Sequence, residues 1–347
     1  MKENYSAIAA KLKAASAGRL TRADYGELLS KSTVNEIYSY LLTTGYRDVL
    51  SELSGKQIHR TEIEKALRHE MIREYGRVYS FMDIDGQRVL EFWFMQREIE
   101  FLKRGLRHLY NKESNDWVEG EDEFEEFFEK HTEIDCGLVK NASTLDKLIE
   151  ACADTPYAGV LKRSQTLGAD YFMMAMMLDR YYYTSAWRAK EKYLSGKDKK
   201  LFEEIFGMEI DINNIIWIYR SKKYFDLSPD VIAAWILPVH HRLSTQTLIQ
   251  LAQGSWEDVI KITKGTVYKE LFDGIDEGYF PEENERRIYC GKARRIFRQN
   301  PESLAAVFAY FDLKEIEIFN ITTVIESIRY GRDKQTIMRH LNIGEEE

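Results

Sequence analysis

Three stretches decide the fold: STVNEIYSYLLTTGYRDVL (Ser32–Leu50), STLDKLIEACADTPYAGVL (Ser143–Leu161) and STQTLIQLAQGSWEDVI (Ser244–Ile260). Each opens with Ser-Thr and continues with apolar residues three and four positions apart, which is the spacing of an amphipathic helix. Each is then interrupted and resumes with an aromatic residue that precedes Val-Leu or Val-Ile. We interpret these aromatic residues, Tyr46, Tyr157 and Trp256, as structurally equivalent.

A second element repeats in the same order. It consists of Glu98-Ile99-Glu100, Glu209-Ile210-Asp211 and Glu315-Ile316-Glu317, each of which follows its Ser-Thr start at nearly the same distance. Two kinds of match at nearly constant spacing indicate an internal repeat rather than chance. The Ser-Thr starts lie about 100 residues apart, so each copy is long enough for a helical bundle of its own. Three such bundles suggest either a rod or a ring closed about a pseudo-threefold axis.

The fold class is predicted to be all-α. No run of the sequence shows sustained alternation of apolar and polar residues, as a strand would. Helix starts are frequent, because capping residues stand three positions before an acid at Thr33, Ser143 and Ser255. We place the three helical repeats at residues 1–117, 118–225 and 226–347.

The net charge is −8, from 49 Lys and Arg against 57 Asp and Glu. Glu113 to Asp135 contain eleven acids and one base, so the remainder of the chain is almost neutral. A chain without a basic stripe is a poor candidate for binding nucleic acid. We interpret the acidic strip as a solvated helix and linker, one face of which packs through Phe124, Phe127 and Phe128.

The sequence gives no sign of membrane insertion or secretion. No run approaches the roughly 20 apolar residues that a membrane-spanning helix needs, and the N-terminus lacks an apolar signal core. The three cysteines, Cys136, Cys152 and Cys290, lie far apart without CxxC spacing. We expect reduced thiols in a cytoplasmic protein.

Motifs for catalysis are mostly missing. The sequence contains no phosphate-binding loop, no GxGxxG and no GxSxG, and the adjacent His240 and His241 diverge too far on a helix to ligate one metal. One enzymatic alternative is a stand-alone all-α enzyme that binds magnesium through the acidic strip at residues 119–126. It has no second metal-binding motif. We therefore expect neither a cofactor nor a metal.

A polar residue interrupts the apolar stripe that follows each repeated acidic element: Lys103, Asn214 and Asn320. A polar side chain in such a stripe needs a partner if it is buried. Two interpretations follow. The residues either make hydrogen bonds within their own bundles or line a cavity that the bundles share.

The chain also resembles a known family. The segments AKLKAASAGRLTRADYGELLSKSTVNEIYSYLLTTGY (Ala10–Tyr46), MEIDINNIIWIYRSKKYFDLSPD (Met208–Asp230) and ARRIFRQNPESLAAVFAYFDLKEIEIFNITTVIESIRYG (Ala293–Gly331) are similar to the C subunit of the V-type (A/V-type) rotary ATPase, called the d subunit in eukaryotes. The sequence departs from the family pattern at Phe101-Leu102-Lys103 and Ile325-Glu326.

The resemblance implies a non-catalytic adaptor made of three similar helical bundles around a pseudo-threefold axis, with the shape of a funnel. One copy would receive the central shaft, made of subunits D and F, at its wide end. Its other face would sit on the membrane ring of proteolipid subunits that carries protons or sodium ions. It would thus lie at the cytoplasmic face of the membrane as a peripheral part of the rotary ATPase.

If the copies close around an axis, Glu100, Asp211 and Glu317 are candidates to line the funnel. They would attract basic residues at the tip of the shaft and guide the encounter. The alternative is that these acids serve helix starts or pair with Arg and Lys within each bundle.

Overall fold

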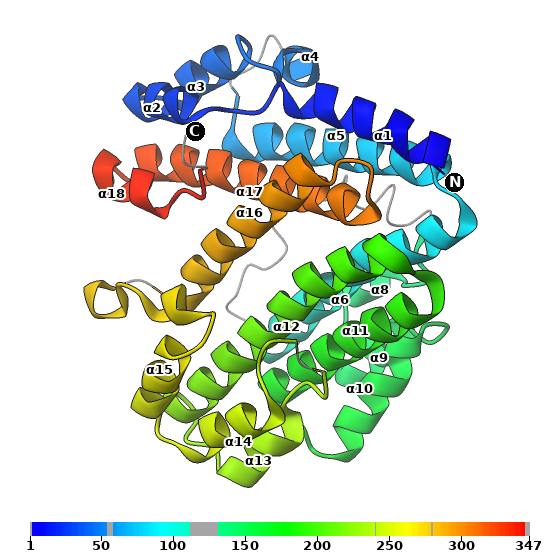
Figure 1. Ribbon diagram of the computed structural model, residues 1–347. Coiled ribbons are helices and arrows are strands. Elements are labelled where there is room, and N and C mark those ends of the chain that lie inside the picture. Colours follow the sequence, from blue (N-terminus) through cyan, green and yellow to red (C-terminus); the bar gives the residue numbers. More distant parts are fainter. Residues whose placement is uncertain (1, 54–57, 112–130, 240, 279, 344–347) are drawn as a thin grey trace. The chain divides into compact units, whose positions relative to one another are not determined.

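The structure, a computed structural model, describes residues 2–53, 58–111, 131–239, 241–278 and 280–343 (Figure 1). Within these ranges the regular elements are helices, and no strand occurs. The all-α class is therefore confirmed. None of the helices in the described ranges is long and apolar enough to cross a membrane.

The chain folds into two compact units. Unit 1 combines Met1–Gln87, Trp117–Thr132 and Ala293–Glu347, whereas unit 2 contains Arg88–Asp116 and Glu133–Lys292. Unit 1 therefore joins the beginning of the chain to its end. The division into three repeats, and their arrangement about a pseudo-threefold axis, stay predictions.

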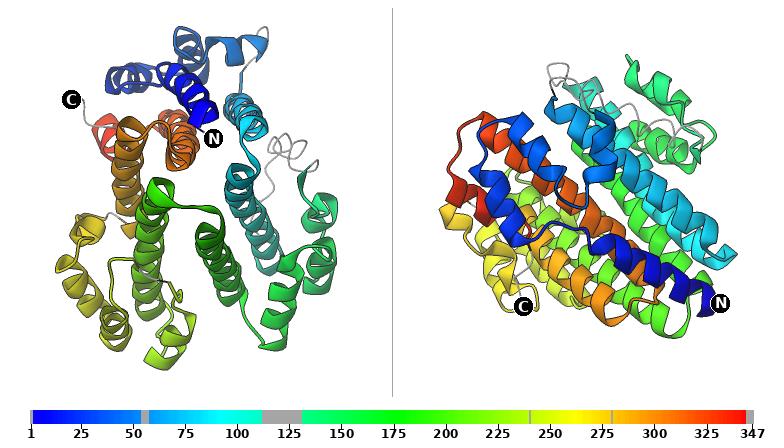
Figure 2. Two further views of the ribbon diagram at one scale, coloured as in Figure 1. Left: turned by 45° about the vertical axis from the view of Figure 1, so that its right-hand side comes forward. Right: turned by 90° about the horizontal axis from the view of Figure 1, so that it is seen from above.

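Unit 1 is built on α17 (Leu304–Arg329), which packs against α5 (Arg60–Phe81). Helix α17 is strongly apolar, and its first two turns from Leu304 to Phe311 are buried on all sides. Figures 1 and 2 show the N-terminal helices lying against it. The remaining helices of the unit are α1 (Lys2–Ser16), α2 (Arg22–Ser30), α3 (Val34–Leu41), α4 (Arg47–Leu50), the 3-10 turn η1 (Ser51–Leu53) and α18 (Lys334–His340).

Unit 2 contains most of α6 (Ile84–Tyr110) and all of α12 (Gly196–Lys223), and shorter helices pack on both. Helix α12 packs against α11, α14 and α15, while Gly105 of α6 lies against side chains of α8 and α9. Helix α16 (Pro281–Gln299) begins in unit 2 and ends in unit 1. The other helices are α8 (Cys136–Lys140), α9 (Leu145–Ala151), α10 (Pro156–Thr166), α11 (Tyr171–Tyr193), α13 (Pro229–Trp235), α14 (Thr245–Gln253), α15 (Trp256–Lys264) and the 3-10 turns η2 (Lys269–Phe272) and η3 (Ile275–Glu277).

Three short helices have hydroxyl caps at equal spacing along the chain. Thr33 caps α3, Thr144 caps α9 and Ser255 caps α15, at equal spacing along the chain. The cap in the second copy is thus Thr144, one residue after the expected Ser143. Ser255 forms a complete capping box with Asp258, whereas Ser244 caps the preceding helix, α14.

Burial follows the same alignment. Ile37, Leu148 and Val259 are fully buried, and each follows its helix cap by four residues. The third copy is therefore in register at Ser255, eleven residues after the Ser244 that the Ser-Thr match suggests. The Ser-Thr match at Ser244 was therefore a weaker guide to the register than the position of the buried apolar residues.

Because unit 1 needs both ends of the chain, shortening the chain is expected to affect the two units differently. Removal of residues 293–347 takes away α17, against which α1, α2, α3 and α5 pack. We expect the amides of residues 2–81 to lose protection from hydrogen exchange while those of 145–264 keep it. Unchanged protection of residues 2–81 in the shortened chain would contradict this description of unit 1.

Candidate functional site

A buried carboxylate on α12 binds both ends of one segment of the chain. Asp211 is fully buried. Its carboxylate accepts hydrogen bonds from the backbone N–H groups of His241 (2.9 Å), Arg242 (2.6 Å) and Leu243 (3.1 Å). It also accepts one from the hydroxyl of Tyr268 at 2.8 Å. Residues 242–268, which contain α14 and α15, are thus fastened to α12 at one point.

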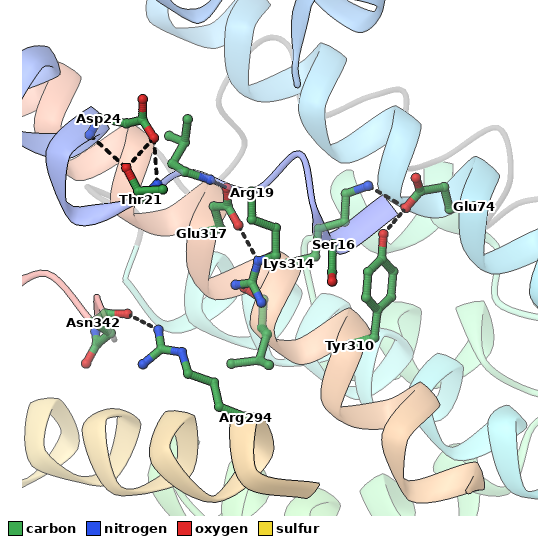
Figure 3. A network of polar contacts seen from close by, with 12 residues as sticks. Ser16, Arg19, Thr21, Asp24, Glu74, Arg294, Tyr310, Lys314, Glu317 and Asn342 are labelled. Atoms are coloured by element: carbon green, nitrogen blue, oxygen red, sulfur yellow. Dashed lines mark hydrogen bonds and ion pairs between the residues drawn. The ribbon is translucent and has the colours of Figure 1, made fainter. Parts of the chain in front are cut away.

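A buried carboxylate on α17 does the same in unit 1. Glu317, with 3% of its side chain exposed, accepts hydrogen bonds from the backbone N–H of Leu20 at 2.7 Å and from Nε of Arg19 at 2.6 Å. Arg19 also donates to the backbone carbonyl of Leu313 at 2.8 Å. Figure 3 shows Arg19 and Glu317 facing each other, with Glu74 of α5 contacting Tyr310 and Lys314 nearer the N-terminal end of α17.

Tyr46 completes this cluster at the end of the N-terminal segment. Its pKa is raised well above the ordinary value for tyrosine by burial and by the neighbouring charge of Glu317. Residues 20–46, which contain α2 and α3, have the same length as residues 242–268. Leu20 and Arg242 are also separated by twice the helix-cap spacing. The two segments are therefore bound to their carboxylates in the same register.

A third tyrosine, Tyr157 in unit 2, also contacts a carboxylate of a long helix. The hydroxyl of Tyr157 donates a short hydrogen bond to the carboxylate of Glu98 on α6. Its pKa is raised by burial and by the charge of Glu98, and the pKa of Tyr268 is raised by burial and by the charge of Asp211. We call Tyr46–Glu317, Tyr157–Glu98 and Tyr268–Asp211 the tyrosine–carboxylate pairs. A hydrogen bond joins the second and the third, and in the first the charge of Glu317 raises the pKa of Tyr46.

Each tyrosine is the last residue of a Thr-x-Tyr turn. The threonine hydroxyl donates to the carbonyl three residues earlier, at 2.6–2.8 Å, and accepts the N–H of the tyrosine, at 3.1–3.3 Å. The tyrosine ring is thereby held toward the long helix. The turns are Thr44-Gly45-Tyr46, Thr155-Pro156-Tyr157 and Thr266-Val267-Tyr268, which recur at the same spacing as the helix caps.

Tyr268, and not Trp256, ends a Thr-x-Tyr turn as Tyr46 and Tyr157 do. Trp256 is the first residue of α15 and packs its ring against Tyr219 with centroids 6.3 Å apart. The missed signal was present in the sequence as TGY, TPY and TVY at equal spacing. The more conspicuous aromatic-x-x-Val pattern concealed it.

The three acids proposed to face the shaft have different environments. Asp211 and Glu317 are buried and bound by N–H donors of their own units, which favours the role within the bundle. Glu100 is half-exposed and pairs with Lys103 at 2.7 Å, and Lys103 also binds Asp179 at 3.0 Å. Glu98, not Glu100, receives the tyrosine in α6.

The two asparagines also serve their own units. Asn214 accepts a hydrogen bond from the backbone N–H of Leu237 at 2.8 Å, and Asn320 accepts one from that of Asn342 at 3.2 Å. Both side chains are buried. Each fixes the chain 22 or 23 residues further on, just after the short helix, α13 or α18, that follows its long helix. These contacts match the first of the two interpretations, hydrogen bonding within a bundle.

Two glycines allow the backbone to approach these clusters closely. A Cβ at Gly45 would lie 2.4 Å from the carbonyl oxygen of Gly18, so the Thr-x-Tyr turn of unit 1 crosses the connection to Arg19 in direct backbone contact. A Cβ at Gly207 on α12 would lie 2.6 Å from the side chain of His241. Both places tolerate only glycine without a shift of the backbone.

Two threonines near the third turn, Thr263 and Thr266, provide a paired test of the turn. Thr263 is fully buried, and its hydroxyl has no hydrogen-bond partner among the described residues, whereas the hydroxyl of Thr266 both donates and accepts. We expect Thr263→Val to raise the free energy of unfolding by about 1 kcal/mol and Thr266→Val to lower it by about as much. Urea unfolding measures both. A loss of stability in both variants would contradict this description.

The pairs also predict sensitivity to alkaline pH. The folded chain holds the pKa of Tyr46, Tyr157 and Tyr268 above the ordinary value of about 10. The stability that depends on the neutral hydroxyls is therefore complete below pH 10 and is lost as pH rises further, because the unfolded chain then releases protons that the folded chain keeps.

Each tyrosine is expected to contribute about 1.4 kcal/mol of lost stability per pH unit above 10. Urea unfolding between pH 9 and pH 11 measures the slope, and Tyr268→Phe is expected to reduce it by the share of one tyrosine. An identical slope in the variant would show that Tyr268 ionises normally in the folded chain.

The chain is similar in sequence to proteins of one known family. Residues 8–340 match the family model described as ATP synthase (C/AC39) subunit. The chain is 22% identical to the A-type ATP synthase C subunit of Methanosarcina mazei, over 98% of this chain and 93% of that protein. The corresponding C subunit of Methanocaldococcus jannaschii is 22% identical (93% and 82% covered), and that of Thermococcus kodakarensis is 23% identical (96% and 89% covered). The chain belongs to the ATP synthase (C/AC39) subunit family.

Proposed function

We propose that the chain is the adaptor that couples the shaft of subunits D and F to the proteolipid ring of a rotary ATP synthase. The match of residues 8–340 to the family carries this proposal, because it covers nearly the whole chain. As a member of the family, the chain is a non-catalytic accessory subunit of the rotary ATP synthase. The finer assignment of its neighbours and of the cytoplasmic face of the membrane comes from the family resemblance.

The hydrogen bonds of buried polar residues in the structure support the proposal. The buried carboxylates Asp211 and Glu317 and the amides of Asn214 and Asn320 all fasten chain segments to long helices. A body fixed in this way is stiff, and close-packed interiors transmit strain, as an adaptor between two rotating parts requires. Glu100, which is half-exposed, is the one of the three candidate acids that stays accessible to a basic shaft.

The magnesium-dependent enzyme considered as an alternative is not proposed. Its acidic strip at residues 119–126, and the phenylalanines Phe124, Phe127 and Phe128 beside it, lie outside the described residues. The family assignment gives the chain an accessory role instead.

The proposal predicts a specific defect when the chain is removed. We expect membranes from cells without the chain to lose ATP-driven ion uptake, while the soluble part of the complex continues to hydrolyse ATP. Purified chain added back should restore uptake, and affinity purification of the tagged chain should bring D, F and the proteolipid subunit with it. Undiminished ion uptake without the chain would contradict the adaptor role.

A further inference from the structure

One carboxylate in each of two long helices holds two distant points of the chain at once. Asp211 binds Arg242 and Tyr268, and Glu317 binds Leu20 while its charge raises the pKa of Tyr46. Arg242 and Tyr268 are as far apart along the chain as Leu20 and Tyr46. A buried charge without its donors is costly, because the desolvation penalty then remains without compensation. Loss of one donor therefore weakens the hold on the other end of the segment.

Apolar contacts account for much of the packing of the short helices α14 and α15 on α12. Helices α14 and α15 pack on α12 through apolar residues such as Leu248, Leu251 and Val259, and apolar attraction is non-directional. Hydrogen bonds to a carboxylate fix distance and direction, and they are about twice as strong as those between neutral groups. The position of each segment along its long helix is thus set by the polar contacts more than by the apolar ones.

Each pair also holds an exposed turn of the chain in place. The middle residue of every Thr-x-Tyr turn is exposed, namely Gly45, Pro156 and Val267, and the tyrosine that follows it is buried. Val267 is 70% exposed although it is apolar. The buried tyrosine holds the exposed turn at a set distance from the long helix.

We propose that the three tyrosine–carboxylate pairs are positioning elements for torque transfer: they keep the short-helix segments from shifting along the long helices while the complex rotates under load. The inference rests on the proposed adaptor function. It assigns a role to Tyr46, Tyr157 and Tyr268 beyond fold stability, because a segment that shifts under load absorbs rotation instead of passing it on.

The first test uses the purified chain and hydrogen exchange. Tyr268→Phe removes the hydroxyl that binds Asp211, and we expect the amides of Arg242 and Leu243 to exchange at least about tenfold faster, which corresponds to the loss of a hydrogen bond to a charged group of about 1.5 kcal/mol or more. The matched control is Tyr183→Phe. Tyr183 of α11 donates to Glu209 of the same helix α12 at 2.8 Å but belongs to no fastened segment. Unchanged exchange in Tyr268→Phe, or equal acceleration in both variants, would overturn the proposal.

The second test measures coupling in the assembled complex. We expect complexes with Tyr268→Phe to transport on the order of half as many ions per ATP hydrolysed, while those with Tyr183→Phe match the parent. If Tyr268→Phe does not fold, Tyr46→Phe replaces it, and hydrogen exchange is then measured at the amide of Leu20. Equal coupling in the parent and in a folded pair variant overturns the proposal. Full coupling in complexes that lack the chain overturns the adaptor function itself. That result is distinct from a failure of the present proposal, because it is obtained without any variant.

Discussion

The buried carboxylate is the constraint on which the rest of the structure depends. A charge that is removed from water needs several donors, and Asp211 obtains four of them from two places far apart in sequence. Helix α12 carries Asp211 and Asn214 on its buried side, and the segment 242–268 must return to Asp211. The close approach of His241 to Gly207 follows from this requirement.

The order of these contacts along the chain also explains why unit 1 contains both ends. Helix α6 binds Tyr157, and α12 binds residues 242–268, so each holds the short helices that follow it. Helix α17 instead holds residues 20–46, which come much earlier in the chain, through Leu20. A cyclic order of this kind is the one expected for three copies closed into a ring, and that arrangement stays a prediction.

Much of the fold followed from local patterns in the sequence. Apolar residues three and four apart predicted the helices, and Asn214 and Asn320 were recognised as polar residues that need partners. The register of the third copy did not follow, because Ser244-Thr245 imitates the start at Ser32 although α14 is the counterpart of α2. Burial at Val259, the cap at Ser255 and the equally spaced Thr-x-Tyr turns distinguish the two alignments.

The candidate site was harder to predict because its partners are distant in sequence. Nothing local shows that Glu317 meets Leu20, 297 residues away. In α6 the acid moves to Glu98, since Lys103 stands where the other long helices carry Asn and pairs with Glu100 and Asp179. Charge type alone could not separate an acid that faces a partner from one that holds its own chain.

A double-mutant cycle on Asp211 and Tyr268 tests the central claim most directly. The free energies of unfolding of Asp211→Asn, Tyr268→Phe and the double variant give the coupling between the two side chains. We predict a coupling energy on the order of 1.5–3 kcal/mol, as for a hydrogen bond to a charged group. Additive effects, within about 0.5 kcal/mol, would show that the two side chains act independently and would contradict the anchoring role of the carboxylate.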